Sequence, residues 1–360
     1  LKKVLATIGT RYFVVFLNLI LISINTKVLG SEGIGLVSIV YASANIALIF
    51  SSVLCGSTIV YFMNRYDFHY VFWPAYVWSF IGSAMACCIM YLFNMLPHGF
   101  ELVIYGLSVL FSLVTIHSRV LLGKDCIKGS NVTFMLPSGL LFFILLFIYF
   151  VMGKKDADAS TWGLFIANGI AWVVSLLLII PFFRRKSSFD PPVSVNKLIR
   201  QMFIYGLWGS ADNLAENLTS RLNYFLLRQM GGYGQVGLLD TGTKVSESVW
   251  HISRSVSFIS YSQTAKTSEP EMQRQLTIRF FKLTYCTLVA DMAIVLLIPE
   301  WVYTEYLFSD EFKGVSGVIQ CLSVGIVALG SNRVLSHYFI ATGKVKYSTL
   351  SSCIGIFVLF

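Results

Sequence analysis

The sequence predicts an all-α polytopic membrane protein, because its composition, its span-length apolar runs and the placement of its basic residues agree. Of the 360 residues, 56% are hydrophobic and only 12% are charged. Soluble domains usually carry about 25% charged residues, so this chain has too few charged side chains to cover a globule of its size. The seven cysteines show no CxxC spacing and indicate neither a zinc site nor a disulfide framework.

Apolar runs of about 20 residues, the length that crosses a bilayer as a helix, recur along the whole chain. They lie near residues 5–26, 36–62, 70–93, 102–122, 133–152, 162–183, 202–227, 236–262, 276–298, 315–340 and 347–360. The final run is too short for a complete span, so we expect the last span or spans to be missing from this chain.

A polar segment, "FFRRKSSFDPPVSVNKLIRQ" (182–201), separates the sixth run from the seventh. It predicts an N-terminal six-span lobe at 1–183, a cytoplasmic linker at 184–201 and an incomplete C-terminal lobe of about five spans at 202–360. With the N terminus in the cytoplasm, 17 Lys and Arg fall on the cytoplasmic side and five on the other. This asymmetry satisfies the positive-inside rule. The net charge of +9 then faces anionic lipid and requires no nucleic acid.

Two pairs of segments repeat in register. "VLGSEGIGLVS" (28–38) follows the first run and "MGGYGQVGLLD" (230–240) follows the seventh. "LLGKDCIKGSN" (121–131) follows the fourth run and "IATGKVKYST" (340–349) follows the tenth. The agreement predicts an internal six-span repeat.

Gly232, Gly234 and Gly237 have the GxGxxG spacing of a dinucleotide-binding loop. That spacing has this meaning only between a strand and a helix, whereas here it lies between two apolar runs. We therefore expect a tight turn, in which glycine takes positive φ, and no nucleotide site.

The eighth run carries a stripe of ionisable residues at spacings of four, three, four and three: Asp240, Lys244, Glu247, His251 and Arg254. The spacing places them on one helix face over about 21 Å. A charge in mid-span costs about 2.5–3.5 kcal/mol, so the stripe predicts a polar cavity or water path. The alternative is that the charges pair along the helix and serve only the structure.

The first and seventh runs are polar on one side as well. The residues concerned are Thr7, Arg11, Asn18 and Asn25 in the first run, with Asp212, Asn213, Glu216, Asn217, Ser220, Arg221 and Asn223 in the seventh. The polar runs predict a cavity between the two halves. His117 is expected near a cytoplasmic span end, at the membrane interface. The residue patterns contain no catalytic set and no metal site, and we expect a non-enzyme.

The repeated segments, together with "YLFSDEFKGV" (306–315), resemble the multidrug/oligosaccharidyl-lipid/polysaccharide exporter superfamily, in its polysaccharide (Wzx-type O-antigen flippase) branch. The resemblance implies two pseudo-symmetric six-helix lobes around a central cavity in the bacterial inner membrane. It implies a flippase that moves an undecaprenyl-pyrophosphate-linked oligosaccharide to the periplasmic leaflet for lipopolysaccharide or other surface polysaccharide biosynthesis. Membrane lipids and a polymerase of the pathway are the expected partners.

Applied to this cargo, the polar residues divide into three groups. Arg and Lys offer donors to phosphate oxygens, so the expected pyrophosphate-binding residues are Arg11, Arg221, Lys244 and Arg254. The expected sugar-binding residues are Asn18, Asn25, Asn217 and Asn223. Counter-ions, or sites for a coupling proton or Na⁺, are expected at Asp212, Glu216, Asp240, Glu247 and His251. No cofactor is expected.

Two other functions stay open at this point. A cation-coupled multidrug or small-molecule antiporter of the same superfamily would carry a carboxylate-dominated cavity, but five Arg or Lys balance five Asp or Glu within the runs. A membrane polysaccharide polymerase or ligase would carry a large periplasmic loop. The longest such segments, near 153–160 and 299–314, are short.

Overall fold

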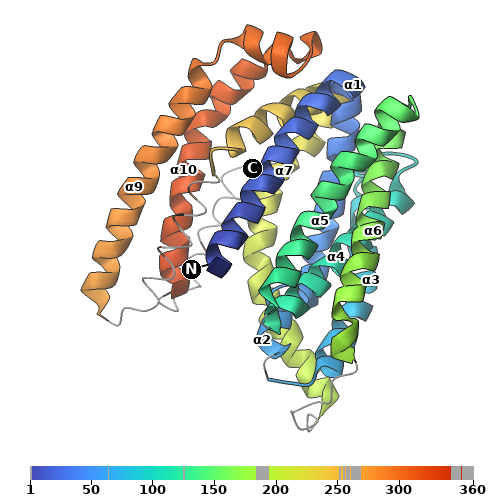
Figure 1. Cartoon of the computed structure of the whole chain (residues 1–360), viewed down its shortest axis with the longest axis vertical. Coiled ribbons are helices and arrows are strands. Elements are labelled where there is room, and N and C mark those ends of the chain that lie inside the picture. The colour runs from blue at the N-terminus through green and yellow to red at the C-terminus, as the bar shows by residue number, and fades with distance from the viewer. Residues whose placement is uncertain are drawn as a thin grey trace. The chain divides into compact units, whose positions relative to one another are not determined.

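The computed structural model describes residues 2–63, 65–124, 126–183, 194–250, 253, 256, 260, 269–341 and 350. In this part of the chain all regular structure is helical (Figure 1). The α-helices are α1 (Lys2–Cys55), α2 (Ser57–Met63), α3 (Phe68–Leu92), α4 (Glu101–Gly123), α5 (Ile127–Leu146), α6 (Ala157–Phe183), α7 (Val195–Glu247), α9 (Pro270–Leu297) and α10 (Val315–Ala341). Short helices η1 (Phe147–Val151), η2 (Val302–Leu307) and η3 (Asp310–Phe312) complete the described elements.

Among the described residues, seven helices are long and apolar enough to cross a membrane. They confirm the predicted class, a multi-pass helical membrane protein. The predicted run at 202–227 falls in α7 and is not among the seven, which fits the polar residues that it carries. The run at 236–262 lies partly outside the described residues, and the run at 347–360 lies largely outside them.

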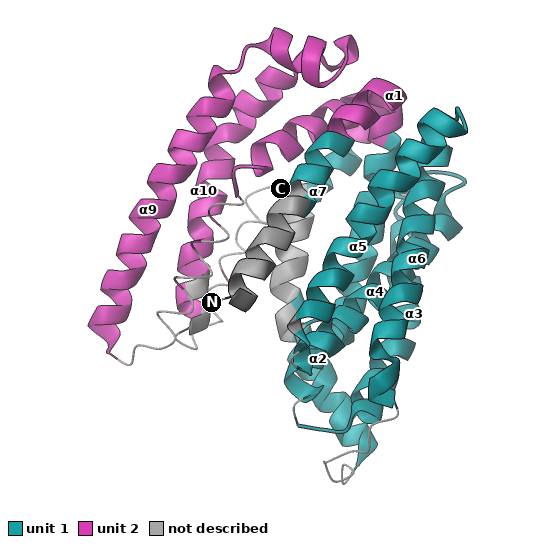
Figure 2. Cartoon of the chain, in the orientation of Figure 1, with its two compact units in different colours: residues 1–21, 36–226 teal, residues 22–35, 227–360 magenta. Residues whose placement is uncertain are grey.

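The described helices group into two units, which Figure 2 shows in different colours. Unit 1 comprises residues 1–21 and 36–226, and unit 2 comprises residues 22–35 and 227–360. Both α1 and α7 therefore contribute to both units. The predicted division into lobes at the linker stays a prediction, since residues 184–193 of that linker lie outside the described residues.

Unit 1 is organised around α4, which packs against α2, α3, α5 and α6. Its largest apolar cluster includes Phe62, Phe72, Leu113 and Ile116. Helix α7 comes close to α1 here, because a Cβ on Gly206 would fall 1.6 Å from the Val53 carbonyl oxygen. Only glycine permits that approach of two helix backbones.

A chain of buried hydrogen bonds joins three helices of unit 1. The Trp172 indole N–H donates to the Tyr76 hydroxyl at 3.1 Å, and that hydroxyl lies 2.7 Å from Nε2 of His117. Nδ1 of His117 lies 2.6 Å from the Ser175 hydroxyl, which donates in turn to the Trp172 carbonyl. A neutral imidazole protonated on Nδ1 satisfies every member, since Tyr76 then donates to Nε2 and Ser175 accepts.

This chain of hydrogen bonds corrects the expectation for His117. Its side chain is completely buried rather than interfacial. The imidazole connects α3, α4 and α6, and both of its nitrogens have partners. A polar group buried in this way is stabilising only while its partners are present.

Unit 2 contains the hairpin of α9 and α10, which pack against each other. The α9–α10 loop (299–314) carries η2 and η3 and packs into an apolar cluster with Ile34 of α1 and Val315 and Ile319 of α10. A second cluster joins Trp250 to Leu288 and Ile326. Residues 22–35 of α1 are thus part of the core of unit 2.

We expect His117→Leu to lower the free energy of unfolding by about 1–3 kcal/mol, because it removes a partner from two hydroxyl groups in the interior of unit 1. Thermal unfolding of the purified protein in detergent measures the effect as a fall in the apparent unfolding temperature. His98→Leu is the control, since the His98 side chain is 91% exposed. Equal shifts in the two variants would contradict the proposed importance of the hydrogen-bonded chain.

Candidate functional site

The glycine turn predicted at residues 232–237 and the matching segment of the first repeat adopt the same backbone conformation. Within α1, Gly30 has φ 66° and ψ −175°, and within α7, Gly232 has φ 74° and ψ −174°. Both values fall in a region that is essentially open to glycine alone. The expected positive φ is confirmed, and each turn is a break in a long helix. The helix before Gly232 also excludes the strand that a dinucleotide loop requires.

The two breaks also approach each other reciprocally within unit 2. A Cβ on Gly35 would fall 1.8 Å from the Tyr233 carbonyl oxygen, and one on Gly237 would fall 2.1 Å from the Ser31 carbonyl oxygen. Gly35 lies five residues after Gly30, and Gly237 lies five residues after Gly232. The contact is therefore symmetric in register, as expected of an internal repeat. We call residues 22–35 the first elbow and residues 227–240 the second elbow.

The charged stripe begins where the second elbow ends. Asp240 and Lys244 form an ion pair of 2.5 Å, in which the aspartate side chain is 3% exposed and the lysine side chain 37% exposed. The structure therefore brings these two predicted residues together and supports the alternative of pairing along the helix for them. Glu247, one turn further, is half-buried. His251 and Arg254 lie outside the described residues.

The residues of α7 around this ion pair include several small polar side chains. Thr241, Thr243 and Ser246 are buried, and Ser246 donates to the Gly242 carbonyl at 2.8 Å. A Cβ on Gly242 would fall 2.7 Å from Cγ1 of Val318, so α7 and α10 pack closely here. These residues were not among the predicted site residues, and the only signal for them in the sequence is the run of small residues around the ionisable ones. Their burial matches that of the Asp240 carboxylate and contrasts with the more exposed lysine.

The predicted Asn and Arg residues of the first and seventh runs have different environments. Asn18 and Asn223 are exposed in unit 1, and Asn25 is half-buried in unit 2. Arg221 donates to the Tyr224 hydroxyl at 2.5 Å and lies 5.1 Å from the centroid of that ring. Arg11 belongs to α1, and Asp212, Glu216 and Asn217 belong to α7. The structure describes only the backbone of these four residues.

Another cation of unit 2 contacts an aromatic ring. The Arg333 guanidinium lies 4.8 Å from the centroid of the Trp250 ring, whose indole N–H donates to the Ile326 carbonyl at 2.7 Å. The sequence analysis did not select Trp250, because no spacing relates it to Arg333, which lies 83 positions further along the chain. The pair joins the segment that follows α7 to α10.

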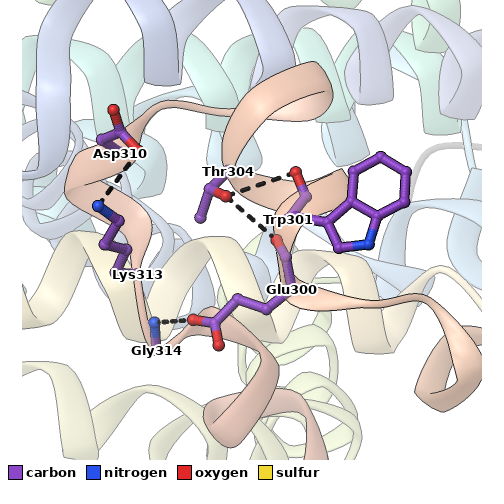
Figure 3. Close-up of polar contacts among 6 residues, drawn as sticks. All are labelled: Glu300, Trp301, Thr304, Asp310, Lys313 and Gly314. Atoms are coloured by element: carbon purple, nitrogen blue, oxygen red, sulfur yellow. Dashed lines mark hydrogen bonds and ion pairs between the residues drawn. The ribbon is translucent and has the colours of Figure 1, made fainter.

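The α9–α10 loop, part of which resembles the superfamily, is held by its own polar contacts (Figure 3). The Glu300 carboxylate accepts from the Gly314 backbone N–H, and Asp310 pairs with Lys313 at 3.4 Å. The Thr304 hydroxyl donates to the carbonyls of Glu300 and Trp301. These bonds fix the shape in which the loop meets the first elbow.

Residues 1–251 match the family described as "Polysaccharide biosynthesis protein". The structure is similar to that of the MATE multidrug transporter DinF-BH, at 15% identity and a TM-score of 0.67, over 97% of this chain and 84% of that one. No curated protein matches the chain.

Two further solved structures show the same architecture. An inward-facing MATE family transporter of the MOP superfamily matches at 15% identity and a TM-score of 0.66, over 93% of this chain and 82% of that chain. An outward-facing one matches at 14% identity and a TM-score of 0.59, over 97% and 83%. At these identities the likeness establishes the fold, and it confirms the predicted fold class.

We expect Gly35→Ala and Gly237→Ala each to destabilise the protein by about 1–3 kcal/mol or more, because each added methyl group meets a backbone carbonyl that cannot move away easily. The apparent unfolding temperature and the yield of monodisperse protein in detergent measure this. Gly317→Ala is the control, since its Cβ would meet nothing within 4 Å in α10. An unchanged unfolding temperature in both elbow variants would show that the elbows do not pack as described.

Proposed function

Because the chain belongs to the polysaccharide biosynthesis protein family, we propose that it is a flippase for a lipid-linked oligosaccharide. The cargo is an undecaprenyl-pyrophosphate-linked O-antigen or similar repeat unit, carried from the cytoplasmic to the periplasmic leaflet by alternating access. The family match over residues 1–251 is the observation that carries this choice, and the transporter fold supports it. The location is the bacterial inner membrane with the N terminus in the cytoplasm, where the pathway's polymerase would receive the cargo.

Lys244 is the described residue best placed to meet the pyrophosphate. Its ammonium has three N–H donors, and one meets Asp240. The side chain is more than one-third exposed while its partner is buried. Asp240 therefore holds the lysine in position and balances its charge before cargo arrives, and the lysine donates to phosphate oxygens when cargo binds.

Arg221 and the asparagines take the remaining contacts. The Arg221 guanidinium, positioned by its bond to Tyr224, offers the planar fork of donors that suits phosphate. Exposed Asn18 and Asn223 and half-buried Asn25 supply amide groups to sugar hydroxyls. Arg11, Arg254 and Asn217 keep the roles that the sequence analysis gives them.

The ion pair also bears on the coupling ion. Asp240 already pairs with the Lys244 ammonium at 2.5 Å, so we assign it the role of counter-ion. The coupling proton or Na⁺ is then carried by Asp212, Glu216, Glu247 or His251.

The second candidate is a cation-coupled multidrug antiporter. The solved structures of similar fold are described as multidrug transporters, and a buried carboxylate such as Asp240 suits a cationic cargo. The two functions differ in which member of the ion pair faces the cargo. The more exposed lysine favours the anionic cargo.

We expect Lys244→Ala and Arg254→Ala to leave the protein inserted and to reduce surface polysaccharide about tenfold or more, the loss expected for a hydrogen bond to a charged group. Arg254→Lys should rescue only partly, since it keeps the charge without the planar fork. Immunoblots of membrane protein and of surface polymer measure the two quantities.

Lys155→Ala is the control for these variants, since Lys155 is exposed in the loop after η1. Normal polymer in both Ala variants would exclude the pyrophosphate role. Loss of drug export with normal polymer would favour the antiporter.

A further inference from the structure

Segments distant in sequence meet in unit 2 through polar contacts between the first elbow and the α9–α10 loop. The Ser23 hydroxyl donates to the Leu307 carbonyl at 2.5 Å, and the Lys27 ammonium donates to the Tyr306 carbonyl at 2.6 Å. The Ser31 backbone N–H donates to Oε2 of Glu311 at 2.6 Å. We call these contacts, with the reciprocal glycine approach to the second elbow, the elbow joint.

Glu311 caps a helix across about 280 residues of sequence. Gly30 interrupts α1, so Ser31 opens a new helical segment whose first N–H groups have no intrahelical acceptor. The Glu311 carboxylate accepts one of them and is favoured by the positive end of the helix dipole. It fits closely, since a Cβ on Gly30 would fall 2.5 Å from Oε2.

The two elbows differ at this point. A Cβ on Gly232 would meet nothing within 4 Å, although Gly232 has the backbone conformation of Gly30. In the part of the chain that the structure describes, the close carboxylate is therefore found at the first elbow, and nothing comes as near to the matched glycine of the second.

The polar contacts of the joint are suited to breaking and forming again. All three lie at exposed positions, and two are made to backbone carbonyl oxygens. Water can take the place of either partner at an exposed position, so breaking such a bond exchanges one hydrogen bond for another. Beneath them, Ile34 is buried with Phe308 and Phe312, which keeps water out while the joint is closed.

We propose that the elbow joint is a gate that opens during the transport cycle, and that Glu311 is its latch. The proposal rests on the proposed function, because alternating access requires the two repeats to separate on each side in turn. The first elbow belongs to the first repeat, whereas the second elbow and the α9–α10 loop belong to the second. Separation of the repeats on this side breaks the three polar bonds and exposes Ile34 to water.

A cross-link across the joint tests the proposal. In a background without the seven native cysteines, Ser23→Cys with Leu307→Cys is joined by a short bifunctional thiol reagent that is cleaved by reduction. Proteoliposomes carrying a fluorescent undecaprenyl-pyrophosphate oligosaccharide report flipping. Cross-linking should abolish flipping and reduction should restore it, while each single-cysteine variant keeps its activity. Full flipping by the cross-linked protein would overturn the gate.

A second measurement does not depend on the cargo. Ile34→Cys, as the only cysteine, is exposed to a water-soluble maleimide in membranes, with the denatured protein as the fully reactive reference. The Glu311→Ala variant should speed labelling about tenfold or more, the effect of one hydrogen bond to a charged group. Glu311→Gln should do so less, since its amide oxygen still accepts from Ser31. Glu305→Ala, in the same loop, is the control.

The two measurements separate the two hypotheses. If the parent protein flips no cargo but Ile34→Cys labels slowly and Glu311→Ala speeds it, the proposed function fails and the gate stands. If position 34 never labels, or its rate is the same with and without the Glu311 carboxylate, the joint is a fixed part of the fold and the proposal is wrong.

Discussion

The reciprocal backbone approach at Gly35 and Gly237 is the constraint on which the closed arrangement of unit 2 depends. Two long helices break at matched positions, and each then passes within contact distance of the other's carbonyl groups. A side chain at either position would force them apart. With the contact in place, Ile34 reaches the α9–α10 loop and the apolar cluster with Phe308 and Phe312 closes. The charged stripe at Asp240 begins three residues after Gly237, so the contact also sets its orientation.

Paired polar side chains recur around this contact. A polar group without a hydrogen-bond partner costs free energy, and three described side chains show how the chain supplies partners. His117 connects α3 to α6 through hydrogen bonds at both ring nitrogens, and Asp240 pairs with Lys244 one turn away. Glu311 accepts from an opened helix end. In each of these three contacts the partner of the side chain lies on another element or on the next turn.

The features that depend on local pattern could be predicted from the sequence. Composition and run lengths predicted the membrane fold, and the glycine-rich segment after the seventh run predicted a turn in which glycine takes positive φ, because these follow from a few neighbouring residues. His117 was misplaced, since a helix apolar on every side does not reveal which face packs inward. The Glu311 cap could not be found from local pattern, because it joins residues 280 positions apart. Within the stripe the spacing predicted the face, whereas the closeness of Asp240 and Lys244 needed the structure.

The shared fold says less about the charge of the cargo than the ionisable side chains do. At 15% identity a shared architecture does not determine the cargo, so under the proposed function discrimination depends on which charge of the Asp240–Lys244 pair the cargo meets. The Asp240 side chain is buried, as are the neighbouring Thr241 and Thr243, and the lysine side chain is the more exposed member of the pair. Under the proposed function, a cationic drug that approaches the lysine side chain would be repelled, whereas a pyrophosphate would gain a charge-assisted hydrogen bond from it.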